Sequence, residues 1–467
     1  MTIQAQLVMI LWFPIVYLLF KSFPVYKAII ISFITSWLFL PVNATFVLTG
    51  LPDYERISAT CYSIVVCIFL FRSQSHKNFR FRWIDISVLV YCIVPFFSSL
   101  SNGLGAYNGL SLVLSHTIEY GLPYFLGRIY LSGAKQLYWV AKSILVSGMI
   151  YIPLCWIEIA LSPILHRLVY GYTGTKLGQN IRYGGFRPTV FMRHGLSVGM
   201  WMMAATLIAF WLWQSGLLKK IWNIPIHIVS FILLVTLIGV KSTGAWAYII
   251  YALFLLFCVK YLRFSLPLLI LCVSIITYLF LTSTGQMDQA LIDNITSFLS
   301  RIFDPSRIES LQFRLDNEHI LSEKALERPL LGWGGYGRNR VFEENSLGIF
   351  EDITVTDSLW IISFGNLGAI GLFSVFATIL IPPIYFWQKI PSKQWLTSQN
   401  ACPSALSIIL ALYSLDCCLN NQFNPVFIVI AGALSGYLVT DNSKQQIVKK
   451  VRKKTKRTVK VIRKQST

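Results

Sequence analysis

Long apolar segments recur along almost the whole chain, and they constrain its fold more than any other feature. A helix needs about 20 apolar residues to cross a bilayer. Because lipid offers the backbone no hydrogen bonds and the alternating pattern of a membrane barrel is absent, we expect helices. The sequence therefore predicts an all-α polytopic integral membrane protein with about 12–13 transmembrane helices and a large external loop of short helices. The expected spans lie near residues 7–20, 28–48, 57–71, 84–100, 110–130, 137–160, 196–213, 221–240, 245–259, 265–281, 359–387, 405–418 and 425–439.

The composition agrees with a membrane protein and argues against a soluble one. Of 467 residues, 55% are hydrophobic and only 13% are charged, whereas soluble domains are about 25% charged. The net charge is +20, but eleven Lys and Arg residues follow Asp441 without a single acid. Much of the excess charge therefore belongs to a basic tail on an apolar body, which disfavours a nucleic-acid-binding protein.

Basic residues in short loops predict the orientation of the spans. If the tail 441–467 is cytoplasmic, counting back along the chain puts the other short basic loops on the same side and the N-terminus outside. The first span has no preceding Lys or Arg and no cleavage site after it, so we expect an anchor, not a signal peptide that is removed. The expected cytoplasmic cations are Lys21, Lys27, Arg72, Lys77, Arg80, Arg82, Lys219, Lys220, Lys260, Arg263, Lys389 and Lys393.

This topology divides the chain into alternating membrane and external parts. Two long segments face the outside, and the second is the only sizeable soluble portion. The expected organisation is N-terminal transmembrane helices over 1–160, a basic external loop over 161–193, transmembrane helices over 194–281, a large external loop over 282–357, C-terminal transmembrane helices over 358–440 and a basic cytoplasmic tail over 441–467.

The first external segment is unusual in its charge. It holds five cations and neither Asp nor Glu, against the tendency of basic loops to stay inside. An anionic ligand would compensate this charge. Alternatively, the loop is long enough to be translocated regardless of its charge. The five cations are Arg167, Lys176, Arg182, Arg187 and Arg193.

The second external segment contains three expected features. Apolar residues at helical spacing predict an amphipathic helix over 289–303. A mixed-charge helix follows over 310–326 and is stopped by Pro329. The glycine-rich turn 332–337 lacks the Gly-Lys-Ser/Thr ending of a nucleotide-binding loop.

Four motifs, in order between residues 185 and 372, resemble the signature of the O-antigen ligase/polymerase family. The motifs are Arg187-Pro188 with Phe191 and His194; Lys241-Ser242 with Gly244, Ala245 and Trp246; Arg314 with Pro329, Leu330, Gly332 and Gly334; and Thr356-Asp357 with Leu359, Gly365, Gly368 and Gly371. Two positions depart from the family pattern. The His of its His-Asn element is absent, with Thr356-Asp357 in its place, and the Arg of its Ser-Arg-Gly-Ala element is Thr243.

The resemblance implies transfer of a glycan from an undecaprenyl-diphosphate donor to a sugar hydroxyl, without a metal or cofactor. Guanidinium groups bind phosphate oxygens in pairs and keep their charge, which suits a diphosphate leaving group. Arg187 and Arg314 are the expected catalytic arginines. Arg193, His194, Lys241, His319 and Arg338 are expected to bind substrate.

Asp357 is the first choice for the general base, because it lies at the mouth of a span beside the missing His. His194 and His319 are the other candidates. The alternative for Asp357 is a helix N-cap, since Asp directly before Ser358 and Leu359 is a typical helix start. The absent family His favours a polymerase slightly over a ligase.

Other polar groups in the spans have structural interpretations. Glu119, Glu158 and Asp416 could relay protons in a transporter, but structural pairing with Arg128 or Lys142 is favoured. The nine cysteines show no metal-ligand spacing and no disulfide framework.

The leading hypothesis is a bacterial inner-membrane polysaccharide polymerase whose acceptor is another lipid-linked repeat. The expected partners are the lipid-linked oligosaccharide, the bilayer, and flippase and chain-length regulator proteins. The alternatives are a ligase acting on a separate lipid or protein acceptor, a flippase for lipid-linked oligosaccharides, and a non-catalytic assembly protein. The tail either binds anionic lipid or only sets the topology.

Overall fold

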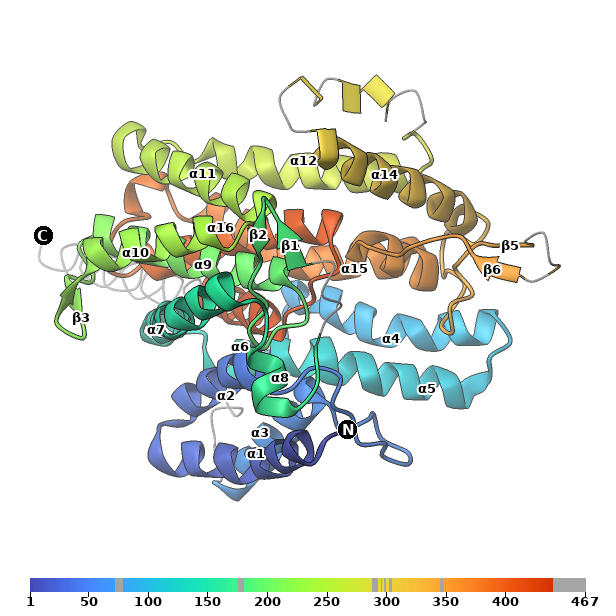
Figure 1. The fold of residues 1–467 in the computed structure, drawn as a ribbon, viewed down its shortest axis with the longest axis horizontal. Coiled ribbons are helices and arrows are strands. Elements are labelled where there is room, and N and C mark those ends of the chain that lie inside the picture. Colours follow the sequence, from blue (N-terminus) through green and yellow to red (C-terminus); the bar gives the residue numbers. More distant parts are fainter. Residues whose placement is uncertain are drawn as a thin grey trace, which may run out of the picture.

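Over the residues that it describes, the computed structural model contains helices throughout and three short hairpins (Figure 1). The predicted tail 441–467, the cations Arg72, Lys77 and Lys176, and most of the predicted amphipathic helix 289–303 lie outside the described residues. The structure describes residues 1–71, 79–174, 180–287, 293–294, 296–297, 300–301, 305–344, 348 and 350–439.

Apolar helices account for each predicted span. Within the described part of the chain, eight helices are long and apolar enough to cross a membrane, and four more are apolar but shorter. The chain is therefore an all-α, multi-pass membrane protein. The long helices are α1 (Ile3–Ser22), α4 (Ile86–Ser101, preceded by a 3-10 turn), α7 (Ala134–Leu161), α9 (Gly195–Gln214), α11 (Thr243–Phe257, extended by a π turn), α12 (Leu266–Ser283), α15 (Leu359–Lys389) and α16 (Ala401–Leu419). The shorter ones are α2 (Val25–Phe39), α3 (Arg56–Leu70), α10 (Ile226–Gly239) and the helix Pro425–Val439.

The span predicted over 110–130 is one interrupted helix. Helix α5 (Gly105–His116) continues through a π-helical turn, Thr117–Gly121, into α6 (Leu122–Tyr130). Pro123 has no N–H to donate, and its ring would collide with the carbonyl of Glu119 in an α-helix. The π turn is therefore a local response to Pro123.

Helix α9 forms the centre of the bundle. It packs against α7, α10, α11 and α16, and nearly all of its side chains are buried, including Trp201 and Trp211. A helix that is apolar on all sides suits a position surrounded by other helices.

Two helices are shorter than the sequence predicted. Helix α2 ends at Phe39 instead of reaching residue 48, because Pro41 drives Leu40 into an extended conformation. Helix α10 starts at Ile226 because the preceding residues form the hairpin of β3 (Lys220–Ile221) and β4 (Ile224–Pro225). Trp222 and Asn223 form its two-residue turn with φ of 48° and 64°.

Connections predicted for the same side of the membrane contact one another. On the predicted external side, the amide of Val42 donates to His166 Nε2 at 3.3 Å, and Asn102 Nδ2 donates to the carbonyl of Gly332 at 2.9 Å. On the opposite side, Ser392 donates to the carbonyl of Arg263. These contacts show which connections lie at the same end of the helix bundle.

The predicted mixed-charge helix is present as α14 (Pro305–Leu326), and the glycine-rich turn after it lies against a break in α15. At the break, Gly368 has φ 64° and ψ −165°. The amides of Trp333 and Gly334 donate to the carbonyls of Gly365 and Asn366 at 2.8 and 2.9 Å, and the amide of Ala369 donates to the carbonyl of Pro329 at 2.7 Å. Two glycine motifs that are separate in the sequence therefore form one structural unit. A hairpin of β5 (Phe342–Glu344) and β6 (Phe350–Asp352) follows the turn.

Candidate functional site

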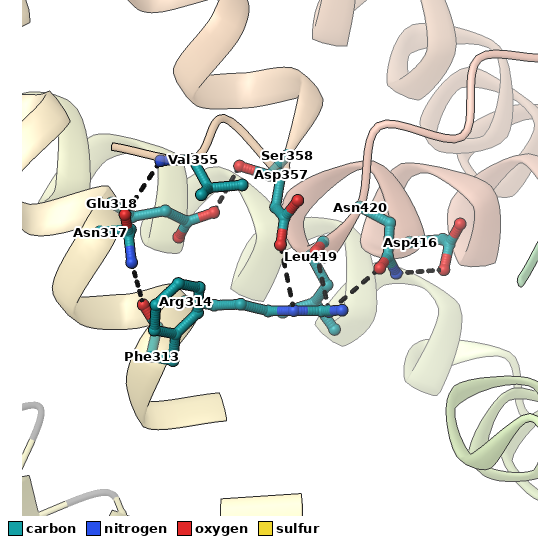
Figure 2. A network of polar contacts seen from close by, with 10 residues as sticks. All are labelled: Phe313, Arg314, Asn317, Glu318, Val355, Asp357, Ser358, Asp416, Leu419 and Asn420. Atoms are coloured by element: carbon teal, nitrogen blue, oxygen red, sulfur yellow. Dashed lines mark hydrogen bonds and ion pairs between the residues drawn. The ribbon is translucent and has the colours of Figure 1, made fainter. Parts of the chain in front are cut away.

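Arg314 lies at the centre of a polar network between α14, α15 and α16 (Figure 2). Its Nη1 donates to Asn420 Oδ1 at 3.1 Å and to the carbonyl of Leu419 at 3.3 Å. Its Nε lies 3.6 Å from Asp357 Oδ2. Asn420 Nδ2 in turn donates to Asp416 Oδ1 at 3.0 Å. The guanidinium is thus held between a helix C-terminus, which presents carbonyl oxygens, and an acid.

Arg187 follows the hairpin of β1 (Ile181–Arg182) and β2 (Gly185–Phe186) and is fully buried. Its amide donates to the carbonyl of Asn180 at 2.7 Å, and its Nη2 donates to Ser242 Oγ at 3.3 Å. A Cβ added to Gly195 would lie 2.6 Å from Arg187 Nε. The glycine at the start of α9 thus leaves room for the guanidinium.

The buried carboxylate of Glu158 holds the loop after Arg187 in place. Glu158, in α7, accepts hydrogen bonds from the amides of Thr189, Val190 and Leu165 at 2.8, 2.7 and 3.0 Å. The sequence interpretation that Glu158 pairs with Arg128 or Lys142 is therefore wrong. It stabilises backbone amides, and so fixes the segment that carries Arg187.

Arg128 and Lys142 have other partners. Arg128 Nε lies 3.0 Å from Asp85 Oδ1, with both side chains buried, and Lys142 lies over the ring of Trp139. Asp416 accepts from Tyr248 at 3.2 Å, as well as from Asn420. Pairing of the predicted membrane acids with Arg128 or Lys142 is thus not observed.

His194 shows that the two segments predicted to be external converge. It is the N-cap of α9, and its Nδ1 accepts a hydrogen bond from the amide of Leu196 at 3.2 Å. Burial, and then the positive charges of Arg187, Arg182, Arg314 and Arg193, lower the pKa of His194 to about 4. Arg314 comes from the second external segment and the other three from the first. The structure therefore brings Arg187, Arg193, His194 and Arg314 together.

The hydrogen bond at Nδ1 also defines what His194 can do. A neutral imidazole that accepts at Nδ1 carries its proton at Nε2. That nitrogen can donate to an anionic ligand but cannot accept a proton from a hydroxyl. His194 thus suits substrate binding better than the role of general base.

Lys241 and Arg193 lie at the edges of the arginine cluster. Lys241 follows α10 with φ 55°, and its Nζ lies over Gly185, where a Cβ would be only 2.1 Å away. Arg193 is exposed and lines a cavity of about 180 Å³ together with Glu55, Arg56 and Gln422. Both positions suit contacts with a substrate near Arg187.

Asp357 is more open than the sequence suggested. Its side chain is 41% exposed, and the N-cap of α15 is Ser358, without a side-chain capping bond. The N-cap interpretation of Asp357 is thus not supported. The carboxylate instead lies beside Arg314 and is accessible to an incoming hydroxyl.

Glu318 is a buried acid that the sequence interpretation missed. Tyr278 donates to its Oε2 at 3.0 Å, and Ser358 donates to its Oε1. Burial raises the pKa of Glu318 to about 7, against the opposing effect of these hydrogen bonds and of Arg314. The sequence does indicate this burial, because Glu318 lies on the same face of α14 as the apolar or small residues Leu315, Ser322 and Ala325.

The two remaining predicted residues lie beside other cavities. His319 lines a cavity of about 160 Å³ with Glu318 and Trp360, and its Nε2 is 3.6 Å from Glu323 Oε1. Arg338 donates to the carbonyl of Asn102 at 3.0 Å and lines a different cavity of about 600 Å³. The cavities beside His319 and Arg338 are thus different from the one that Arg193 lines.

The described residues contain neither a cluster of possible metal ligands nor a disulfide. Among the described residues, no group of three or more His, Cys, Asp or Glu side chains is placed to hold a metal ion. All nine cysteines are free and buried.

The fold and the site define a multi-pass α-helical membrane protein with a cluster of arginines beside two acids. In comparisons with known proteins, no protein-family model matches the chain, and no curated protein matches it.

Proposed function

We propose that the protein is a polysaccharide polymerase that transfers glycan from an undecaprenyl-diphosphate donor to a sugar hydroxyl of a lipid-linked acceptor. The proposal joins the motif resemblance to the O-antigen ligase/polymerase family with the convergence of arginines from two distant segments. The single observation that carries it is the position of Arg187 and Arg314 around His194.

The arginine cluster suits a diphosphate leaving group. In the transfer, the acceptor oxygen attacks the anomeric carbon of the donor glycan. The bond from that carbon to the phosphate oxygen breaks, and its electron pair leaves with undecaprenyl diphosphate. Arg187 and Arg314 stabilise this developing charge, while Arg193, Lys241 and the Nε2–H of His194 contact the remaining phosphate oxygens.

Asp357 is the proposed general base. Its carboxylate lies 3.6 Å from Arg314 Nε and is open to solvent. A hydroxyl that approaches the diphosphate would therefore also approach Asp357, which accepts its proton. His319 and Arg338 are proposed to contact the sugars of the substrate, since both line cavities along α14.

The proposed location is the bacterial inner membrane, with the arginine cluster on the periplasmic side and the tail 441–467 in the cytoplasm. The proposed partners are the bilayer, a flippase that delivers the lipid-linked repeat and a chain-length regulator. No metal or other cofactor is required in this scheme, because cations of the chain neutralise the diphosphate.

The test uses the full-length protein in lipid nanodiscs with lipid-linked repeat units and without ATP. A ladder of products of increasing length supports the polymerase. Attachment only to an added lipid A-core or protein acceptor would replace it by a ligase, and movement of the lipid-linked repeat without a new bond would replace it by a flippase. Full activity of Arg187→Ala or Arg314→Ala would refute the diphosphate clamp, with the exposed Arg301→Ala as the matched control.

A further inference from the structure

A further cavity, with polar side chains in its wall, lies next to the arginine cluster. It has a volume of about 260 Å³ and lies between α4, the π turn, α15 and the loop that follows α16. Tyr91, Glu119, Tyr120, Asn366 and Phe423 are among the residues that line it. None of these residues takes part in the diphosphate clamp.

Glu119 is placed in this cavity by the π turn. The π turn Thr117–Gly121 changes the helical register locally, and such turns are frequent at functional sites. Glu119 keeps accessible surface although it lies within the helix bundle, because it lines this cavity. No described residue donates a hydrogen bond to its carboxyl group, and the only charge acting on it is the like charge of Glu55.

Neutral polar atoms and aromatic rings complete the cavity. Among the described residues, neither the buried Asn366 Oδ1 nor the buried His116 Nδ1 has a hydrogen-bond partner. The ring of Tyr120 lies 4.7 Å from that of Tyr91 and 4.5 Å from that of Phe423. A carboxylate, an amide and aromatic faces together offer hydrogen-bond acceptors for hydroxyls and an apolar surface for the C–H face of a sugar ring.

The loop after α16 connects this cavity to the arginine cluster. Asn420 accepts the hydrogen bond from Arg314. Asn421 and Phe423 line both this cavity and the neighbouring one that contains Arg193 and Arg56. Ligands in the two cavities would therefore contact opposite sides of the same short loop.

We propose that the cavity around Glu119 is a subsite for one sugar ring of the lipid-linked substrate, with the Glu119 carboxylate accepting hydrogen bonds from its hydroxyl groups. The volume is below the roughly 300–1,000 Å³ of sites for drug-sized ligands, which fits a single ring. The assignment of this ring to the lipid-linked substrate rests on the proposed function, whereas the proposal that the cavity binds a sugar does not.

The experiment measures binding in nanodiscs with two separate probes. One is the free oligosaccharide released by mild acid from the lipid-linked pool of the source cell, and the other is undecaprenyl diphosphate alone. Glu119→Gln keeps the size of the side chain but removes its charge. We expect it to weaken oligosaccharide binding about tenfold or more, as for loss of a charge-assisted hydrogen bond, and to leave binding of undecaprenyl diphosphate unchanged.

A second variant and a control complete the design. Phe423→Leu, which keeps apolar bulk but removes the aromatic face, should also weaken oligosaccharide binding. Glu343→Gln, on the exposed strand β5, should change neither binding constant. Arg314→Ala should weaken the binding of undecaprenyl diphosphate and leave the binding of the oligosaccharide unchanged.

The outcomes separate the two proposals. Unchanged oligosaccharide binding by both Glu119→Gln and Phe423→Leu, or no binding by the wild type, would overturn the subsite and leave the polymerase intact. Sugar binding that depends on Glu119 in a protein that forms no glycosidic bond would retain a sugar site but overturn the polymerase.

Discussion

The contact between the glycine-rich turn and the break in α15 predicts a large difference between two similar substitutions. Gly368 and Gly216 both have positive φ, 64° and 67°. A Cβ on Gly368 would lie 2.3 Å from the backbone of Leu330, whereas a Cβ on Gly216 would meet nothing within 4 Å. Gly368→Ala and Gly216→Ala therefore both place a side chain at positive φ, but only Gly368→Ala creates a steric contact, and the ψ of −165° puts Gly368 in a region that is almost exclusive to glycine.

The difference in the free energy of opening the turn can be estimated from the contacts that each alanine disrupts. Backbone strain of roughly 1–3 kcal/mol is expected for an alanine at such positions, and it is larger at Gly368 because its φ and ψ belong to a region almost exclusive to glycine. Only Gly368→Ala also displaces the turn, which three short hydrogen bonds link to α15 through Trp333, Gly334 and Ala369. At about 1 kcal/mol for each bond, the turn should open about 3 kcal/mol more easily in Gly368→Ala than in Gly216→Ala.

Hydrogen exchange of the purified protein in detergent measures this opening. Peptides that cover residues 329–334 should exchange roughly 100-fold faster in Gly368→Ala and at the wild-type rate in Gly216→Ala. Equal protection of these peptides in the two variants would show that the turn does not depend on its contact with the break, and the reasoning would fail.

Three further substitutions test the site. Arg314→Lys keeps the charge but not the planar fork, so kcat/KM for chain extension should fall roughly 10- to 100-fold; wild-type kinetics would contradict the clamp. Glu158→Gln cannot accept all three amide hydrogen bonds, so proteolysis within residues 180–194 should accelerate as for a loss of about 1–3 kcal/mol; an unchanged cleavage rate would argue against this support. The Glu318 carboxyl releases its proton near pH 4 when unfolded and near pH 7 when folded. The folded state thus holds more protons between these values, and stability should fall by up to about 3 kcal/mol as the pH rises from 4 to 7. Thermal unfolding of Glu318→Gln should lack this fall, and an identical pH profile would refute the role of Glu318.

The helices could be predicted from the sequence because each span is long, apolar and bounded by polar or glycine-rich connections. The errors were at boundaries, where local conformation overrides hydropathy. Pro41 ends α2 early, and the turn at Trp222 and Asn223 uses apolar residues that were assigned to a span. Hydropathy measures which residues prefer lipid and does not detect a hairpin made from such residues.

The candidate site was predictable in part. Arg187 and Arg314 were selected for their motifs and their chemistry, and the structure places both near His194. The partners of Glu158, Asp416 and Arg128 were not predictable, because tertiary contacts choose them. Backbone amides distant in the sequence bind Glu158, and no periodicity or spacing indicates such a partner.

The central position of α9 has a consequence for how the protein is made. Helix α16, one of the helices that cover α9, lies near the C-terminal end of the described chain. While the chain is being synthesised, the side of α9 that α16 later covers therefore faces lipid or the insertion machinery. A chain that stops before α16 would keep its N-terminal helices but leave the side of α9 that α16 covers unpaired, as a target for membrane quality control.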